Sequence, residues 1–316
     1  MPLNSSNSYR RGFTSAAGAY ILWGILPVYW KLLQQVPAYE ILAHRVLWSF
    51  VFLFLLLVCT RQLNQFYTEA KSLITQPKKA FSILAASILI SVNWLVYIWA
   101  VNDGRIVETS LGYYINPLVN VLLGILFLKE RLSRAQIVSV LLAAAGVLYL
   151  ALHFGSVPWV ALSLATSFGL YGLCKKLLNI GAVTGITLET LLITPIALSF
   201  LIYWHNSGLS VLHSDQPLAT VLLLGSGVIT AIPLLLFARG ANALPLSVIG
   251  FIQFLSPTIA LLVGIFAYHE TFSSVHLVAF SLIWLALVIF LAAQTNGLSQ
   301  MQAQVSYKVK QWCKLS

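Results

Sequence analysis

Polar side chains that could bind a small solute recur within the apolar segments of this sequence. Tyr113, Asn116 and Asn120 stand at positions i, i+3 and i+7, so one helical face would carry all three. Pro117 lies in the same segment and would leave one backbone carbonyl without its helical hydrogen bond. The stripe predicts a cavity wall that hydrogen-bonds a substrate. Ordinary hydrogen bonds between helices are the alternative.

A matching set of polar residues occurs in the second half of the chain. Gln253 and Ser256 precede Pro257 at the spacing that the first stripe has before Pro117. We expect the two stripes to face each other across the centre of the molecule. Asn116 and Gln253 would then contact a substrate from opposite halves.

Charged residues also fall inside an apolar segment, where Glu40, His44 and Arg45 form a small cluster. Glu40 and His44 are four residues apart and can touch on a helix. Arg45 is deep enough to need either a carboxylate partner or a water-filled cavity. The cluster predicts recognition of a substrate anion or coupling to protons. A fixed ion pair that locks the helix is the alternative.

Aromatic residues suggest a second wall of the same site. Asn93 and Tyr97 share a helical face, and Trp94 sits in the middle of an apolar segment, where anchoring at the membrane interface explains it poorly. Tyr29 and Trp30, in contrast, fit the role of interface anchors. The first group predicts an aromatic-lined pocket suited to amphiphilic or planar solutes.

Motifs for catalysis and cofactor binding are missing from the sequence. The three cysteines form no CxxC pair, and the six histidines are dispersed. No HExxH, GxxxxGK[ST] or GxSxG motif occurs. We therefore predict no enzyme, no metal site and no cofactor. We also predict no nucleic-acid partner, because most of the basic residues lie in short clusters between apolar segments.

The composition indicates which elements must position these residues. Hydrophobic residues make up 59% of the 316 residues and charged residues only 8%, against about 25% charged in a soluble domain. A membrane-spanning helix needs about 20 apolar residues. Ten segments qualify, which predicts an all-α integral membrane protein with ten transmembrane helices: 12–34, 39–60, 79–101, 107–128, 134–152, 157–178, 184–204, 218–240, 246–268 and 274–294.

Basic residues predict the orientation of these spans. With a cytoplasmic N-terminus, 15 of the 18 Lys and Arg residues fall in segments on the cytoplasmic side and two on the other, while Arg45 lies within a span. Such a bias predicts that both termini are cytoplasmic. Residues 295–316 would form a cytoplasmic tail.

An internal repeat predicts how the spans are organised. The pattern Pro-x6-Gly-x5-Glu occurs at 117–130 and again at 257–270. Each repeat, 1–152 and 153–294, would hold five spans, so the second would be inserted upside down relative to the first. Two inverted five-helix repeats are an architecture of many secondary transporters. Glu130 and Glu270 end their spans beside turns, where they are expected to cap or pair locally.

Several motifs resemble those of a known family. The chain resembles the RarD branch of the EamA group, within the drug/metabolite transporter superfamily. The resemblance implies ten spans, an inner-membrane location and a permease role, with members described as chloramphenicol-sensitivity or chloramphenicol-resistance permeases. The motifs are AYILWGILPVYWK (19–31), VPAYEILAHR (36–45), NW (93–94), LGYYINPL (111–118), KERL (129–132) and QFLSPT (253–258).

These observations predict a secondary permease that moves a small metabolite or drug-like solute by alternating access. A non-transporting membrane scaffold or sensor is the alternative. The expected partners are the small-molecule substrate and membrane lipid. The small residues Ala143–Gly146 would suit either scaffold packing or a homodimer contact.

Overall fold

The computed structural model describes residues 3–102, 106–153, 159–178, 180–211, 216–268 and 273–293. These described segments are helical, joined by short turns. The predicted tail and Glu270 lie outside them. The helices are α1 (Leu3–Lys31), α2 (Ala38–Cys59), α3 (Leu63–Thr75), α4 (Pro77–Asn102), α5 (Ile106–Leu128), α6 (Arg134–His153), α7 (Trp159–Leu178), α8 (Ala182–Asn206), α9 (Pro217–Ala243), α10 (Leu246–Gln253), α11 (Leu255–Tyr268) and a terminal helix, Ser274–Ala293.

Eight helical segments in the described part of the chain are long and apolar enough to cross a membrane, with α10 and α11 counted together. Their bounds agree with the predicted spans to within a few residues. Large apolar side chains on the outer surface, such as Phe81 and Ile196, are 72% and 73% exposed. Lipid explains a surface of this kind better than water does. The protein is therefore a multi-pass membrane protein.

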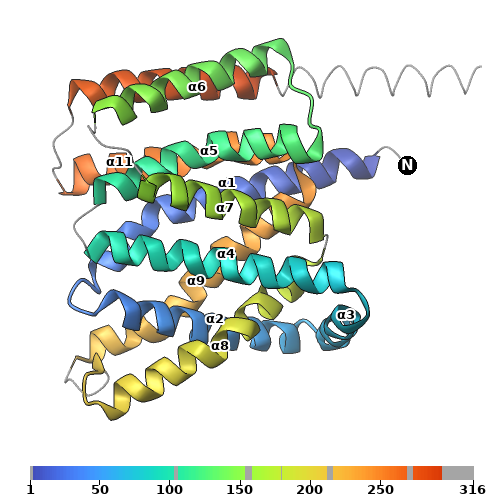
Figure 1. Cartoon of the computed structure of the whole chain (residues 1–316), viewed down its shortest axis with the longest axis vertical. Coiled ribbons are helices and arrows are strands. Elements are labelled where there is room, and N and C mark those ends of the chain that lie inside the picture. Colours follow the sequence, from blue (N-terminus) through green and yellow to red (C-terminus); the bar gives the residue numbers. More distant parts are fainter. Residues whose placement is uncertain are drawn as a thin grey trace, which may run out of the picture.

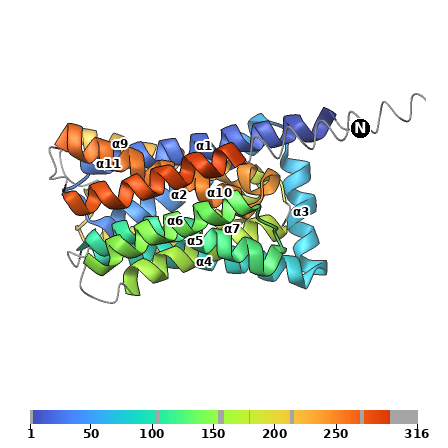
Figure 2. The ribbon, with the colours of Figure 1, turned by 90° about the horizontal axis from the view of Figure 1, so that it is seen from above.

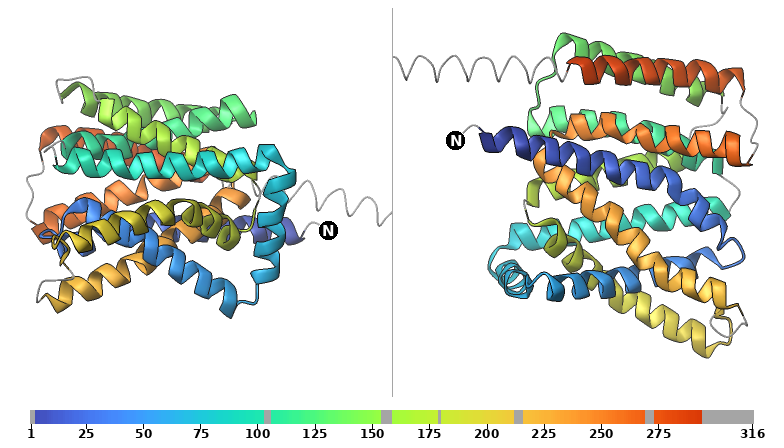
Figure 3. Two further views of the ribbon diagram at one scale, coloured as in Figure 1. Left: turned by 60° about the horizontal axis from the view of Figure 1, so that its bottom comes forward. Right: turned by 180° about the vertical axis from the view of Figure 1, so that it is seen from behind.

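The long helices run roughly along one common axis, and α6 and the terminal helix form an outer layer at one side of the bundle (Figures 1 and 3). Gly146 of α6 allows this pair to approach closely. A Cβ at Gly146 would lie 2.8 Å from the carbonyl oxygen of Ala279 in the terminal helix. The small-residue stretch thus serves packing within the chain, which is the first of its two predicted roles.

A short helix occupies the segment predicted to be a linker between the second and third spans. In α3, Phe66, Ala70 and Leu73 recur at i, i+4 and i+7 and pack beside a cluster that contains Ile83 and Ile180. Figure 2 shows α3 lying across the end of the bundle that carries the N-terminus. The prediction missed it because 13 residues are too few to span a bilayer.

The ninth predicted span, 246–268, is interrupted. Helix α10 ends at Gln253, and α11 begins at Leu255. Pro257 has no N–H to donate to the carbonyl of Gln253, so the helical ladder loses a bond at this turn. Helix α5, in contrast, continues through Pro117.

Lys129 ends α5 in a left-handed conformation, with φ of 54°. The N–H of Glu130 donates to the carbonyl of Gly124 at 3.1 Å, which closes the end of the helix. Because a Cβ is disfavoured in this conformation, Lys129→Gly is expected to stabilise the protein by about 1 kcal/mol. Thermal unfolding in detergent measures the change. Lys129→Ala is the control, since alanine keeps the Cβ, and an equal gain from both variants would contradict the strain argument.

Candidate solute-binding cavity

A cavity of about 170 Å³ lies between the helices of the bundle and receives residues from both halves of the sequence. From α1, α2, α4 and α5 it is lined by Tyr20, Trp23, Leu26, Pro27, Trp30, Arg45, Asn93, Trp94, Tyr97, Gly112, Tyr113 and Asn116. From α7, α9, α10 and α11 it is lined by Leu164, Phe168, Thr230, Leu234, Gln253, Ser256, Pro257 and Ala260.

Most of the residues predicted to bind a substrate meet at this cavity. Its lining includes Asn93, Trp94, Tyr97, Tyr113, Asn116, Gln253 and Ser256, but not Asn120. Of the predicted charge cluster, Arg45 lines the cavity, whereas Glu40 and His44 do not. Substrate contact by these residues stays a prediction, but their convergence on one cavity is a geometric fact.

The two predicted polar stripes do face each other, and they are hydrogen-bonded. Asn120 Nδ2 donates to Gln253 Oε1 at 2.8 Å and to Asn116 Oδ1 at 3.2 Å. Gly250 permits this approach, because its Cβ position is 2.6 Å from the carbonyl oxygen of Pro117. The amides therefore connect α5 to α10. Gln253 Nε2 keeps no protein acceptor among the described residues.

Two further amide contacts fix α7 against the first half of the chain. Asn116 Nδ2 donates to the carbonyl of Ala165 at 2.7 Å. Asn93 Nδ2 donates to the carbonyl of Leu164 and to Ser167 Oγ, both at 2.9 Å. Asn93 and Asn116 therefore line the cavity and also form hydrogen bonds between helices, which was the alternative role that the sequence allowed.

Arg45 occupies the cavity without a carboxylate partner among the described residues. Its Nε donates to Thr230 Oγ1 of α9 at 3.0 Å. The guanidinium carbon lies 4.6 Å from the ring centroid of Trp30 and 4.9 Å from that of Trp94. Such distances are typical of cation–π contacts. Arg45 therefore meets the second of its two predicted environments, a cavity, rather than a fixed ion pair.

Glu40 and His44 have partners of their own. Glu40 Oε1 accepts hydrogen bonds from Ser210 Oγ at 2.8 Å and from the backbone N–H of Val211 at 3.0 Å. His44 Nδ1 accepts one from Trp48 Nε1 at 3.1 Å. Both side chains are buried. Glu40 thus connects α2 to the segment after α8, and the predicted three-residue cluster does not act as one unit at the cavity.

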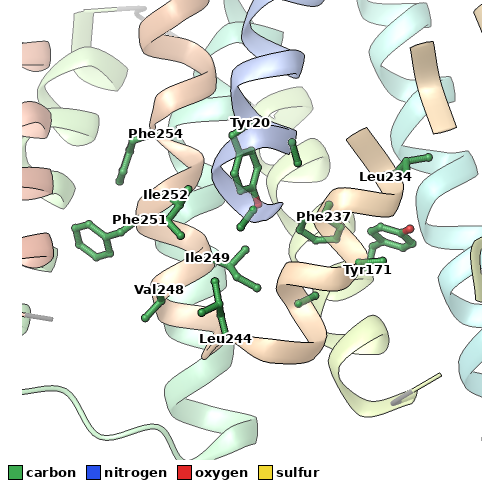
Figure 4. Close-up of a cluster of buried hydrophobic side chains, with 14 of the residues drawn as sticks. Tyr20, Tyr171, Leu234, Phe237, Leu244, Val248, Ile249, Phe251, Ile252 and Phe254 are labelled. Carbon is green, nitrogen blue, oxygen red and sulfur yellow. The ribbon is translucent and has the colours of Figure 1, made fainter. Parts of the chain in front are cut away.

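Aromatic and aliphatic side chains close the cavity toward the end of the bundle that carries the N-terminus. Tyr20, Tyr171, Phe237 and Phe251 are at most 1% exposed. Figure 4 shows Tyr20 and Phe237 close to the apolar side chains of α10. Tyr113, which also lines the cavity, is 45% exposed. The cavity is therefore sealed at one end.

Polar contacts reinforce the sealed end. Glu130 caps α10, since its carboxylate accepts from the N–H of Leu246 at 2.6 Å and from the N–H of Ser247 at 3.0 Å. Glu130 therefore caps a helix, as expected, but one 116 positions along the chain rather than a local turn. A buried ion pair joins Lys175 Nζ of α7 to Glu189 Oε1 of α8 at 2.6 Å.

Sequence reasoning missed several residues of the cavity. Trp30 was expected to anchor at the membrane interface, whereas the structure places its ring against Arg45 at the cavity. A signal existed, since Tyr20, Trp23, Pro27 and Trp30 recur at i, i+3, i+7 and i+10 on one face of α1. For Thr230, in contrast, no periodic pattern in the sequence indicated a place at the cavity.

The EamA-like transporter family model matches residues 10–152. The chain is 52% identical to "Uncharacterized transporter YojE" of Bacillus subtilis (strain 168), covering 91% of this chain and 95% of that protein. It is 43% identical to "Protein RarD" of Escherichia coli (strain K12), covering 89% and 94%. A "Chloramphenicol-sensitive protein RarD" of Pseudomonas aeruginosa is 31% identical, covering 88% and 93%.

A solved structure titled "Crystal structure of protein" superposes with a TM-score of 0.65. The alignment covers 91% of this chain and 99% of that chain at 17% sequence identity, which supports the fold alone. The sequence relatives establish the family, because they are 52% and 43% identical over nearly the whole chain. The chain belongs to the RarD branch of the EamA-like transporter family.

Proposed function

We propose that the protein is a secondary permease that moves a small metabolite or drug-like solute across the inner membrane by alternating access. The observation that carries the proposal is the cavity, which draws its lining from both halves of the chain and is sealed at one end. A cavity of this kind can load from one side and release to the other after the helices rearrange. A scaffold would not need a cavity of this kind.

The proposal includes ten spans in two inverted five-helix repeats. Helices α1 and α7 would be the two spans that are added to the eight apolar segments. Both contribute residues to the cavity. Contact between α5 and α10 through Asn120 and Gln253 supports a central position for the matching stripes of the two repeats. The charge bias supports cytoplasmic termini, so the sealed end would face the cytoplasm.

Counterflow in proteoliposomes tests the function. Purified protein is reconstituted with an unlabelled solute inside, and uptake of the same labelled solute is followed against protein-free vesicles. Chloramphenicol belongs in the first panel, because one relative is named for sensitivity to it. Saturable exchange of at least one solute is expected. If solutes that bind the purified protein are never exchanged, a scaffold or sensor role replaces the permease.

Asn116→Ala and Gln253→Ala are each expected to weaken binding of an exchanged solute by about 1–3 kcal/mol, the cost of an unpaired buried polar group. Asn242→Ala is the matched control. Its amide also joins two segments, donating to the carbonyl of Ile180 at 2.9 Å, but it does not line the cavity. Affinity and melting temperature are measured together. Lower stability with unchanged affinity in both cavity variants would leave these amides as helix contacts only.

A further inference from the structure

The described lining of the cavity holds a single charged side chain. Among its twenty lining residues, Arg45 is the only Asp, Glu, Lys, Arg or His. The four described carboxylates with printed partners are engaged elsewhere: Glu40 with Ser210, Glu69 with Lys79, Glu130 with the start of α10, and Glu189 with Lys175. Within the described residues, the cavity therefore presents one positive charge and no carboxylate beside it.

The environment of Arg45 fixes its orientation but leaves most of its donors free. A guanidinium carries five N–H groups. Nε is held by Thr230, and the rings of Trp30 and Trp94 lie near the guanidinium carbon. The two terminal nitrogens have no protein acceptor among the described residues. An ammonium group could not be held in this way, because it has neither a planar face nor a fork of parallel donors.

A cation at membrane depth is costly unless an anion or water compensates it. Carboxylates satisfy a guanidinium fork with two parallel, charge-assisted hydrogen bonds. The remaining walls are largely aromatic, including Trp23, Tyr97 and Phe168. An empty cavity of about 150 Å³ already accepts a benzene ring, and the volume here is about 170 Å³. The space suits one flat ring with a carboxylate at its edge.

We propose that Arg45 binds the carboxylate of an organic monoanion whose flat apolar body lies against the aromatic walls. This inference rests on the proposed function and specifies the substrate class of the same cavity. Gln253 Nε2, which has no acceptor in the described part of the chain, supplies a neutral donor for a second polar atom of the solute. A dianion or a cation is disfavoured, since the cavity offers only one compensating charge.

Matched acid and amide pairs test the proposal on the purified full-length protein. The probes are benzoate and benzamide, phenylacetate and phenylacetamide, and indole-3-acetate and indole-3-acetamide, titrated by calorimetry. At least one acid is expected to bind about tenfold more tightly than its amide, which is the discrimination of one charge-assisted hydrogen-bonded pair. Arg45→Gln should remove the preference, while Arg45→Lys should retain only part of it.

Arg239→Gln is the control, because Arg239 is an exposed arginine of α9 that does not line the cavity. The preference should survive in this variant. Melting temperatures establish that each variant is folded, and the wild-type comparison of acid with amide needs no variant at all. Absence of acid binding, equal binding of acid and amide, or a preference that persists in folded Arg45→Gln would each overturn the proposal.

Counterflow of the same probes separates this inference from the permease. Acids that bind through Arg45 without being exchanged support the anion site and contradict the permease. Neutral or cationic solutes that are exchanged equally well by wild type and Arg45→Gln support the permease and contradict the anion site.

Discussion

Replacing Gly227 with alanine is expected to destabilise the bundle by about 2–3 kcal/mol, toward the upper end of the range for overpacking. A Cβ at this position would lie 2.2 Å from the backbone carbonyl carbon of Trp48 and 2.5 Å from the backbone nitrogen of Ser49. This is the closest approach at any described glycine. Backbone atoms cannot rotate away as a side chain can, so α2 and α9 must separate.

Thermal unfolding in detergent measures the effect, and Gly18→Ala of α1 is the matched control. A Cβ at Gly18 meets its nearest neighbour, Leu236 Cδ1, at 3.6 Å, an ordinary contact. The control is expected to gain up to about 1 kcal/mol from better helix propensity. Equal melting temperatures for the two variants would contradict the close crossing of α2 and α9.

The same substitution should disturb the cavity, since Thr230 lies one turn beyond Gly227 on α9. Ser49 Oγ also donates to the carbonyl of Gly227 at 3.0 Å, so this crossing fixes α2 where it carries Arg45. A wider crossing would lengthen the bond between Arg45 Nε and Thr230 Oγ1. Weaker binding of carboxylate probes should therefore accompany the lower stability.

The spans could be predicted from the sequence because membrane thickness sets the length of an apolar helix. The length of an apolar segment cannot reveal α3, which is short and packs on one face only. It also cannot reveal the break at Phe254, because the segments on both sides of the break are apolar. Both features depend on local hydrogen bonds and tertiary packing rather than on hydropathy.

Part of the cavity lining could be predicted because helical periodicity is also visible in a sequence. Asn116 and Gln253 belong to periodic stripes beside prolines. The environment of Arg45 was not predictable in this way, because Thr230 is 185 positions away in the chain. Lys175 is one of the 15 basic residues that the charge bias assigned to the cytoplasmic side, yet it lies within α7 and pairs with Glu189. Proximity across helices is fixed by packing, which one sequence does not reveal.

Breaking the pair of Lys175 and Glu189 is expected to cost about 3–5 kcal/mol, because one charge would remain buried without its partner. The side chains are 5% and 3% exposed. Tyr171 also donates to Glu189 Oε2 at 3.1 Å, so the carboxylate is satisfied by two residues of α7. Glu189→Gln leaves the ammonium unpaired, and Lys175→Met leaves the carboxylate with Tyr171 alone.

The double variant Lys175→Met with Glu189→Gln distinguishes a charge effect from lost packing. Since neither charge remains, most of the stability lost in each single variant should return. Glu69→Gln is the matched control for a half-buried pair: its partner is Lys79, the two side chains are 26% and 20% exposed, and the expected loss is at most about 1 kcal/mol. Melting temperatures of the four variants measure the difference. If the losses of the single variants simply add in the double variant, the two charges do not stabilise each other, and the contact between α7 and α8 at the sealed end depends on apolar packing instead.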